Sequence, residues 1–184
     1  MQKTLEIRVE VHRLPLSRAS IVALRNLNRY DLVVCTSKNA RKFFAVELKE
    51  RRVQPAQRTT IIQVGPRRDL LKFPIDNMHI LFPRSALAPY DIVRQLRARG
   101  AVVRVIPLYT TDSVPLSPPQ KESLLRGEVA RLAFKSPSGV HGLVGQLEKK
   151  EREVVFRIPA QCIGYTTARA AREAGFKKIS IKSV

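Results

Sequence analysis

A strand, a serine turn and the start of a helix occur twice in this chain, and a glycine follows each copy at the same distance. The copies are DLVVCTSKNARKFF and ARLAFKSPSGVHGLV, in which Ser37 and Ser136 follow the apolar strands. Gly65 lies 28 residues after Ser37, and Gly164 lies 28 residues after Ser136, each at the end of another apolar run. One offset of 99 residues relates both signals. This agreement indicates an internal duplication.

The segment between the two copies continues the alternation of strands and helices. Residues 80–82 predict a strand, residues 86–99 have helical spacing and end before Gly100, and residues 101–108 predict another strand. Short apolar strands that alternate with helices are typical of parallel sheets covered by helices. We therefore expect an α/β fold with parallel sheets.

The duplication also predicts two lobes. The segment SVPLSPPQKES, residues 113–123, is rich in proline and polar residues, and this composition predicts a connection between them. We expect a first α/β lobe over residues 1–110, with a leading linker strand, and a second, shortened α/β lobe over residues 111–184.

The ligands of open α/β sheets bind beyond the carboxyl ends of the strands. The segments expected at these ends share hydroxyl groups, small residues and cations, and they are residues 36–39, 65–68, 83–85, 109–110, 136–139 and 165–167. Helix N-termini point to the same region and favour anions. These features predict an anion-binding cleft between the lobes. The same residue types also cap helices and form turns, so a purely structural role stays open at each turn.

The charge of the chain implies a polyanionic partner. Lys and Arg number 34 against 15 Asp and Glu, which leaves a formal net charge of +19. Nucleic acid is the commonest partner of such proteins. However, the basic residues are spread along the chain, aromatic residues make up only 6%, and there is no Trp to stack on bases. Composition alone leaves the partner open.

Several kinds of chemistry lack support in the sequence. The histidines His12, His79 and His141 do not have the spacing of metal ligands. Nucleotide-binding, dinucleotide-binding and hydrolase motifs are absent. Cys35 and Cys162 lie in apolar runs and are expected to be buried thiols. We expect no metal and no cofactor, so that catalysis would depend on binding and orientation.

No part of the sequence predicts contact with a membrane. No apolar run approaches the roughly 20 residues that span a bilayer. The first 11 residues lack the apolar core of a signal peptide. We therefore expect a cytoplasmic protein.

Six short motifs, in this order, resemble those of the uroporphyrinogen-III synthase family. They are VVCTSKNA, IIQVGP, HILFPRSA, GAVVRVIPLYTT, LAFKSPSG and CIGYTTARAAREAG. Each motif is short, but the ordered set is fairly specific and extends from about Val11 to the end of the chain. The resemblance implies two flavodoxin-like lobes joined by a two-stranded linker, with a cleft between them.

The resemblance also implies an activity. The family cyclises the linear tetrapyrrole hydroxymethylbilane, with loss of water and inversion of the terminal ring, and needs no cofactor. The substrate carries eight carboxylates, which suits a cationic protein. The resemblance makes a hand-over from hydroxymethylbilane synthase possible.

The position of each motif implies the site residues. Tyr109 matches a tyrosine of the family that assists departure of the hydroxyl group, although an aromatic residue at a strand end can serve packing alone. The expected substrate-binding residues are Ser37, Lys38, Asn39, Gly65, Arg84, Ser136, Ser138, Gly139, Thr166 and Thr167. Among them Lys38 and Arg84 are chosen for their charge, as are the additional candidates Arg67, Arg68 and Lys135, and each of these is a surface cation in the simpler interpretation.

The sequence departs from the family pattern in ways that leave the activity open. The family has a strand and a helix before the segment that here begins as LEIRVEVHRLPL, and we do not find them. Without them we expect an incomplete C-terminal lobe of three strands, with exposed sheet edges that favour self-association or a partner. The main alternative is an inactive basic relative that binds nucleic acid or another polyanion. A third possibility is an α/β module that binds a different small anion.

Overall fold

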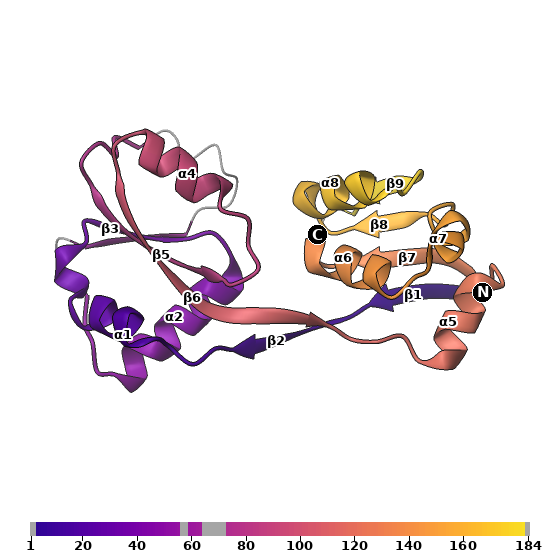
Figure 1. Cartoon of the computed structure of the whole chain (residues 1–184), viewed down its shortest axis with the longest axis horizontal. Coiled ribbons are helices and arrows are strands. Elements are labelled where there is room, and N and C mark those ends of the chain that lie inside the picture. The colour runs from indigo at the N-terminus through magenta and orange to yellow at the C-terminus, as the bar shows by residue number, and fades with distance from the viewer. Residues whose placement is uncertain (1–2, 56–58, 64–72, 183–184) are drawn as a thin grey trace. The chain divides into compact units, whose positions relative to one another are not determined.

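The chain divides into two compact units, each with its own sheet (Figure 1). The computed structural model describes residues 3–55, 59–63 and 73–182. Unit 1 comprises residues 1–10 and 111–184, and unit 2 comprises residues 11–110. We expected residues 1–10 to lead into the first lobe, and the structure groups them instead with residues 111–184.

Unit 2 contains the larger sheet. Its strands, in spatial order, are β2 (Val9–Arg13), β6 (Val102–Ser113), β5 (His79–Ser85), β3 (Leu32–Cys35) and β4 (Thr60–Gln63). Strand β3 pairs in parallel with β4 and β5, and β5 pairs in parallel with β6. The parallel α/β arrangement predicted from the sequence is therefore present.

Helices cover both faces of this sheet. They are α1 (Arg18–Arg25), α2 (Lys38–Glu50) and α4 (Asp91–Ala98), with a short 3-10 helix η1 (Leu27–Arg29). The residues of β3 alternate between two apolar clusters, because successive side chains of a strand point to opposite faces. Val33 packs in the cluster that includes Leu24 of α1 and Phe44 of α2, whereas Val34 packs in the cluster that includes Leu96 of α4. The strand is buried on both sides, as its unbroken apolar sequence predicts.

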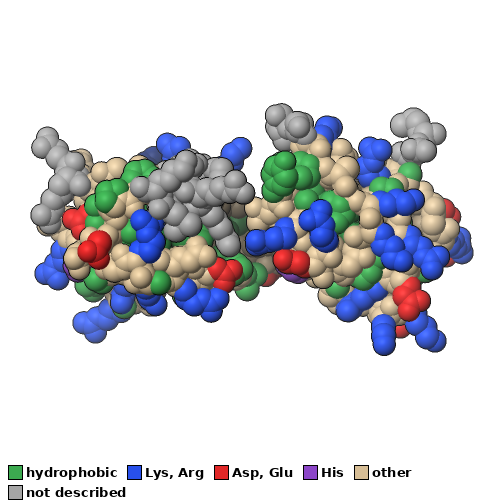
Figure 2. Space-filling model, turned by 90° about the horizontal axis from the view of Figure 1, so that it is seen from above, with side chains coloured by type: hydrophobic (Ala, Val, Ile, Leu, Met, Phe, Trp, Pro, Cys, Tyr) green, Lys and Arg blue, Asp and Glu red, His purple; other side chains and the backbone are tan. Residues whose placement is uncertain are grey.

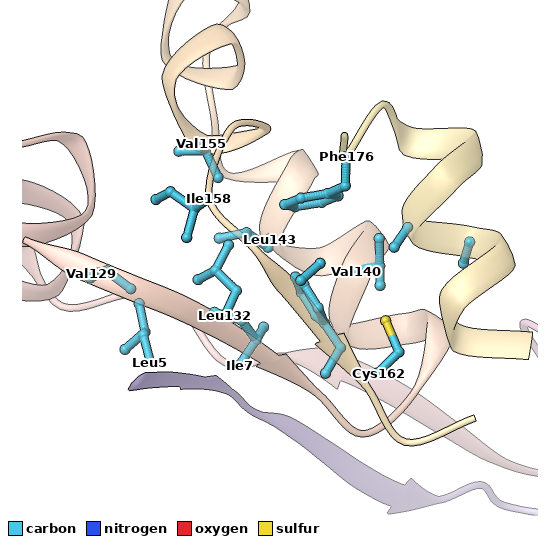
Figure 3. Packing of buried hydrophobic residues seen from close by; sticks show 14 of the residues in the cluster. Leu5, Ile7, Val129, Leu132, Val140, Leu143, Val155, Ile158, Cys162 and Phe176 are labelled. Atoms are coloured by element: carbon cyan, nitrogen blue, oxygen red, sulfur yellow. The ribbon is translucent and has the colours of Figure 1, made fainter. Parts of the chain in front are cut away.

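Unit 1 contains a second parallel sheet. Its strands, in spatial order, are β1 (Lys3–Ile7), β7 (Val129–Phe134), β8 (Ala160–Cys162) and β9 (Ile179–Ile181). Its helices are α5 (Pro118–Leu125), α6 (Pro137–Gly145), α7 (Lys149–Val155) and α8 (Tyr165–Ala174). Figure 3 shows the core, where Leu132 of β7 and Val140 of α6 lie in one cluster with Phe176.

Two expectations about unit 1 were wrong. Its sheet has four described strands rather than three, because β1 pairs with β7 along its length. Part of the expected connection is helix α5, which Ser117 caps by accepting a hydrogen bond from the Gln120 amide. Leu124 anchors this helix in the core. The prolines at its start do not interrupt it, since the first helical positions need no amide hydrogen.

The duplication is visible in how the strands pair. Leu32 of β3 lies opposite Thr60 of β4, and Leu132 of β7 lies opposite Ala160 of β8. Each pair is separated by 28 residues, the spacing found between the serine and glycine signals. The repeated spacing in the sequence is therefore the register of a parallel strand pair.

The chain passes between the two units within β2 and β6, which are neighbours in one sheet. The Leu14 amide donates to the Leu108 carbonyl at 2.9 Å, and the Val114 amide donates to the Arg8 carbonyl at 3.2 Å. Because the order of the partners is reversed, the two strands run antiparallel. A pair of strands thus connects the units, as the family resemblance implied.

Strands β5 and β6 extend further than the sequence predicted. Arg84 and Ser85 were expected in a turn, yet they lie within β5, where Ser85 pairs with Tyr109 of β6. Pro83 is tolerated there because the pairing of β5 with β3 ends at Leu81. Beyond this point, β6 is the one partner of β5 among the described strands. The extension places the two predicted site residues Arg84 and Tyr109 on adjacent strands.

No helix in the described part of the chain has the length and apolar character needed to cross a bilayer.

Candidate active site

Tyr109 and Ser37 form the centre of the candidate site in unit 2. The hydroxyl oxygens of the two side chains lie 2.9 Å apart, and either can donate. Ser37 also caps helix α2, because its Oγ accepts a hydrogen bond from the Ala40 amide at 3.0 Å. The phenol is thereby connected to the positive end of a helix of 13 residues.

The surroundings of Tyr109 keep its phenol protonated at neutral pH. The residue is only 7% exposed, and its ring stacks on Phe43 with centroids 5.4 Å apart. Burial raises the pKa of Tyr109, while the hydrogen bond with Ser37 and the charge of Arg84 act in the opposite direction. A neutral phenol beside groups that stabilise its anion can donate a proton.

Arg84 of β5 is a buried cation next to this pair. Its Nε donates to the Ser85 carbonyl at 3.1 Å, and its Nη2 donates to the Pro89 carbonyl at 3.2 Å. The guanidinium carbon lies 4.3 Å from the centre of the Tyr90 ring. The remaining nitrogen, Nη1, is buried and has no hydrogen-bond partner among the residues that the structure describes.

The duplicated turn in unit 1 has the same capping geometry. Ser136 follows β7 and accepts a hydrogen bond from the Gly139 amide at 3.2 Å, which caps α6. Ser138, in the first turn of α6, is partly buried. Strands β7 and β8 are adjacent and parallel, so the turn at Gly164 lies at the same edge of the sheet.

The threonines after Gly164 differ in accessibility. Both lie in the first turn of α8, whose N-cap Gly164 provides no side chain. Thr166 is exposed, whereas Thr167 is only 3% exposed and packs into the unit. The turn therefore presents the hydroxyl of Thr166 and amide groups at the start of the helix.

The other predicted site residues in the described part of the chain differ in accessibility and in their partners. Lys38 is exposed and Asn39 is partly buried in the first turn of α2. Lys135 pairs with Glu6 at 2.8 Å, so its charge is already matched. Gly65, Arg67 and Arg68 lie outside the described residues.

Two side chains of the site, Phe43 and Tyr90, were not predicted. No motif marks either of them. Phe43 contacts Tyr109 because helix α2 packs on the face of the sheet that carries Leu108 and Tyr109, which depends on long-range strand pairing. The only signal available was the apolar spacing of α2, which does not say what the helix covers.

The described residues offer no cluster of three or more His, Cys, Asp or Glu side chains that could hold a metal. Cys35 and Cys162 are buried and unpaired by disulfides, as predicted. Burial raises the pKa of Cys35 to about 11, so this thiol near Tyr109 stays protonated and is a poor nucleophile.

Comparison with known proteins identifies the family. A family model described as uroporphyrinogen-III synthase HemD matches residues 68–184. This chain belongs to the uroporphyrinogen-III synthase family. A curated relative, the porphyrin biosynthesis protein HemD of Ruminiclostridium josui, is 25% identical to this chain. The alignment is 199 residues long and covers 93% of the chain. The chain spans 39% of the length of that relative.

Solved structures of uroporphyrinogen-III synthases share the fold. A mutant enzyme from the extremely thermophilic bacterium Thermus thermophilus aligns with a TM-score of 0.62 at 21% identity, over 95% of this chain and 81% of that one. The enzyme from Helicobacter pylori aligns with a TM-score of 0.58 at 14% identity, over 97% of this chain and 92% of that one. The two-lobed α/β fold expected from the family resemblance is confirmed at this level.

Proposed function

We propose that this chain is a uroporphyrinogen-III synthase, which cyclises hydroxymethylbilane with loss of water and inversion of the terminal ring. The observation that carries the proposal is the protonated, buried phenol of Tyr109, hydrogen-bonded to Ser37 at the start of α2. Family membership supplies the substrate, and the geometry around Tyr109 supplies a proton donor.

In the proposed reaction, Tyr109 assists the first bond cleavage. The bond between the terminal methylene carbon and its hydroxyl oxygen breaks, with the electron pair of the pyrrole nitrogen moving to the methylene carbon. The oxygen takes the phenolic proton and leaves as water. Ser37 then donates to the phenolate oxygen, while the nearby charge of Arg84 further stabilises it.

The later steps depend on how the substrate is held. The substituted carbon of the last ring attacks the methylene carbon and gives a spiro intermediate, which opens and closes again with the ring inverted. The proton that the final pyrrole releases restores the tyrosine, so protons balance over the cycle. Orientation is sufficient for these steps, because alignment alone can contribute roughly 7–11 kcal/mol to the lowering of a barrier.

The turns of each unit are suited to bind carboxylates. In unit 2 the first turn of α2 includes Lys38 and Asn39, and in unit 1 the first turn of α6 includes Ser138 and Gly139. Amide hydrogens at such positions attract anions. An alanine side chain at Gly139 would have its nearest neighbours, atoms of Ile7 and Phe134, at 3.6 Å or more, so Gly139→Ala is sterically tolerated.

The charge of the protein supports a polycarboxylate ligand without selecting it. Lys and Arg side chains are dispersed over the face seen in Figure 2, and the formal net charge is +19. Binding of nucleic acid by an inactive relative remains the alternative prediction. It would fall steeply with salt and would tolerate the loss of Tyr109.

A coupled assay tests the proposed function. Hydroxymethylbilane is generated in situ by its upstream synthase in the presence of the purified full chain, and the oxidised porphyrin isomers are separated. We expect isomer III in clear excess over isomer I, which forms spontaneously. Isomer I alone, from protein that is folded by circular dichroism, would refute the proposal. The hand-over from the upstream synthase stays a separate prediction.

A further inference from the structure

Arg84 is a buried cation, and the described residues provide no matching anion for it. The residue is 3% exposed, and its Nη1 has no hydrogen-bond partner in this part of the chain. The bonds from Nε and Nη2 both end on main-chain carbonyls. Burial lowers the pKa of Arg84, and the groups that act against this effect are the phenols of Tyr90 and Tyr109 rather than a carboxylate of the described residues. Proteins rarely bury a charge unless it is paired, so the unused nitrogen indicates a missing partner.

The start of α4 adds a second feature that attracts anions to the same place. Arg84 binds the Pro89 carbonyl and lies against the ring of Tyr90, the N-cap residue of α4. The side chain of Tyr90 accepts no hydrogen bond from the first turn of this helix, which has eight residues. Asp91 follows, but its carboxylate pairs with Arg94 at 2.6 Å. The positive end of α4 and the guanidinium are therefore close together.

We propose that Arg84 binds a carboxylate of the ligand through Nη1, at a site formed by β5 and the residues that precede α4. This inference rests on the proposed function for the chemical class of the ligand, a tetrapyrrole with several carboxylates. The bound carboxylate accepts one charge-assisted hydrogen bond from Nη1, while Nε and Nη2 keep their bonds to the backbone.

Tyr90 covers the guanidinium until the ligand binds. Its ring lies over Arg84, yet the residue is 52% exposed, so the ring can turn away without opening the core. Until then, the cation–π contact offsets part of the unfavourable burial of the charge. A carboxylate that replaces this contact gains a stronger partner.

The inference predicts opposite effects of Arg84→Met on binding and on stability. Methionine keeps much of the side-chain volume and removes the unpaired charge, so the melting temperature is expected to stay the same or rise. The Ser85 carbonyl keeps its bond from the Ala88 amide, so it is not left without a donor. A residue with only a structural role would lower the melting temperature instead.

The experiment measures binding of uroporphyrin III, a stable compound with eight carboxylates, to the full chain by fluorescence titration. Three proteins are compared: wild type, Arg84→Met and the control Arg25→Met, which removes an exposed charge from α1 of the same unit. We expect affinity to fall at least tenfold in Arg84→Met and less than twofold in the control. Equal affinities for the two variants, or no binding by wild type, would overturn the inference.

The isomer assay on the same preparations separates this inference from the proposed function. If wild type forms isomer III while Arg84→Met keeps full affinity, the inference fails and the proposed function stands. If wild type forms only isomer I while binding depends on Arg84, the proposed function fails and the carboxylate site stands.

Discussion

The duplication provides a matched pair of substitutions that isolates the contact between Ser37 and Tyr109. Ser37→Ala removes a helix cap and the partner of a buried phenol, whereas Ser136→Ala removes a cap of the same geometry. The capping bonds are 3.0 Å and 3.2 Å long, so the caps are comparable. Loss of a serine cap destabilises by about 1 kcal/mol.

The phenol accounts for the expected difference between the two variants. Tyr109 is 7% exposed and loses its 2.9 Å partner in Ser37→Ala, which adds about 1 kcal/mol. Ser37→Ala should then destabilise by about 2 kcal/mol, which corresponds to a roughly 30-fold change in the unfolding equilibrium. In a Tyr109→Phe background the same substitution should have only the effect of the cap, about 1 kcal/mol.

Urea unfolding followed by circular dichroism at 222 nm measures these free energies. Hydrogen exchange of the Ala40 and Gly139 amides reports each cap locally, since these amides donate to the two serines. The reasoning is refuted if Ser37→Ala has the same effect with and without the phenol. In that case the short distance between the hydroxyls would contribute nothing to stability.

Three further predictions concern the site and its support. Tyr109→Phe should lower the rate of isomer III formation by about 10²-fold or more, while KM changes little. Steady-state kinetics would measure both, and an unchanged rate would exclude proton donation by this phenol. Burial raises the pKa of Cys35 from 9.0 to about 11. The free energy of unfolding should therefore be at its full value below pH 9 and fall by about 2 kcal/mol as the pH rises toward 11. Urea titrations of wild type and Cys35→Ala at several pH values would measure this loss, and parallel pH profiles of the two proteins would contradict it. Arg13 donates hydrogen bonds to Glu47, which is 1% exposed. Arg13→Met should therefore lower the free energy of unfolding by about 2 kcal/mol or more. Thermal unfolding of this variant and of Arg25→Met measures the effect, and equal melting temperatures would disprove the role of this ion pair.

Local patterns in the sequence were sufficient to predict the repeated unit. The 28-residue spacing is a strand register, and in each copy the serine after the strand is followed by a helix, as the repeated pattern predicted. Gly100 also follows helix α4 with φ of +83°, a conformation that favours glycine. The serine turns and Gly100 depend on neighbours within a few residues. The strand register is long-range, but it is visible in the sequence because the same spacing occurs twice.

Long-range pairing limited what could be predicted of the site. Arg84 was expected at a turn, as a substrate-binding residue or, in the simpler interpretation, a surface cation. Pairing of β5 with β6 continues past it instead and buries it beside Tyr109. Tyr90 has no signature at all, since its role follows from where Arg84 points. The start of helix α5 was wrongly predicted to be part of a connection, although serine followed by two prolines is a favourable helix start.

The pairing of β1 with β7 has a consequence for synthesis of the chain on the ribosome. Lys3–Ile7 emerges before the other described strands, and its partner Val129–Phe134 follows more than 120 residues later. At roughly 5–20 residues per second, this first strand waits about 6–25 s for its place in the sheet. Unit 2 is one continuous stretch and has all its strands by then. We therefore expect unit 2 to fold first and β1 to be the segment that a ribosome-associated chaperone would shield.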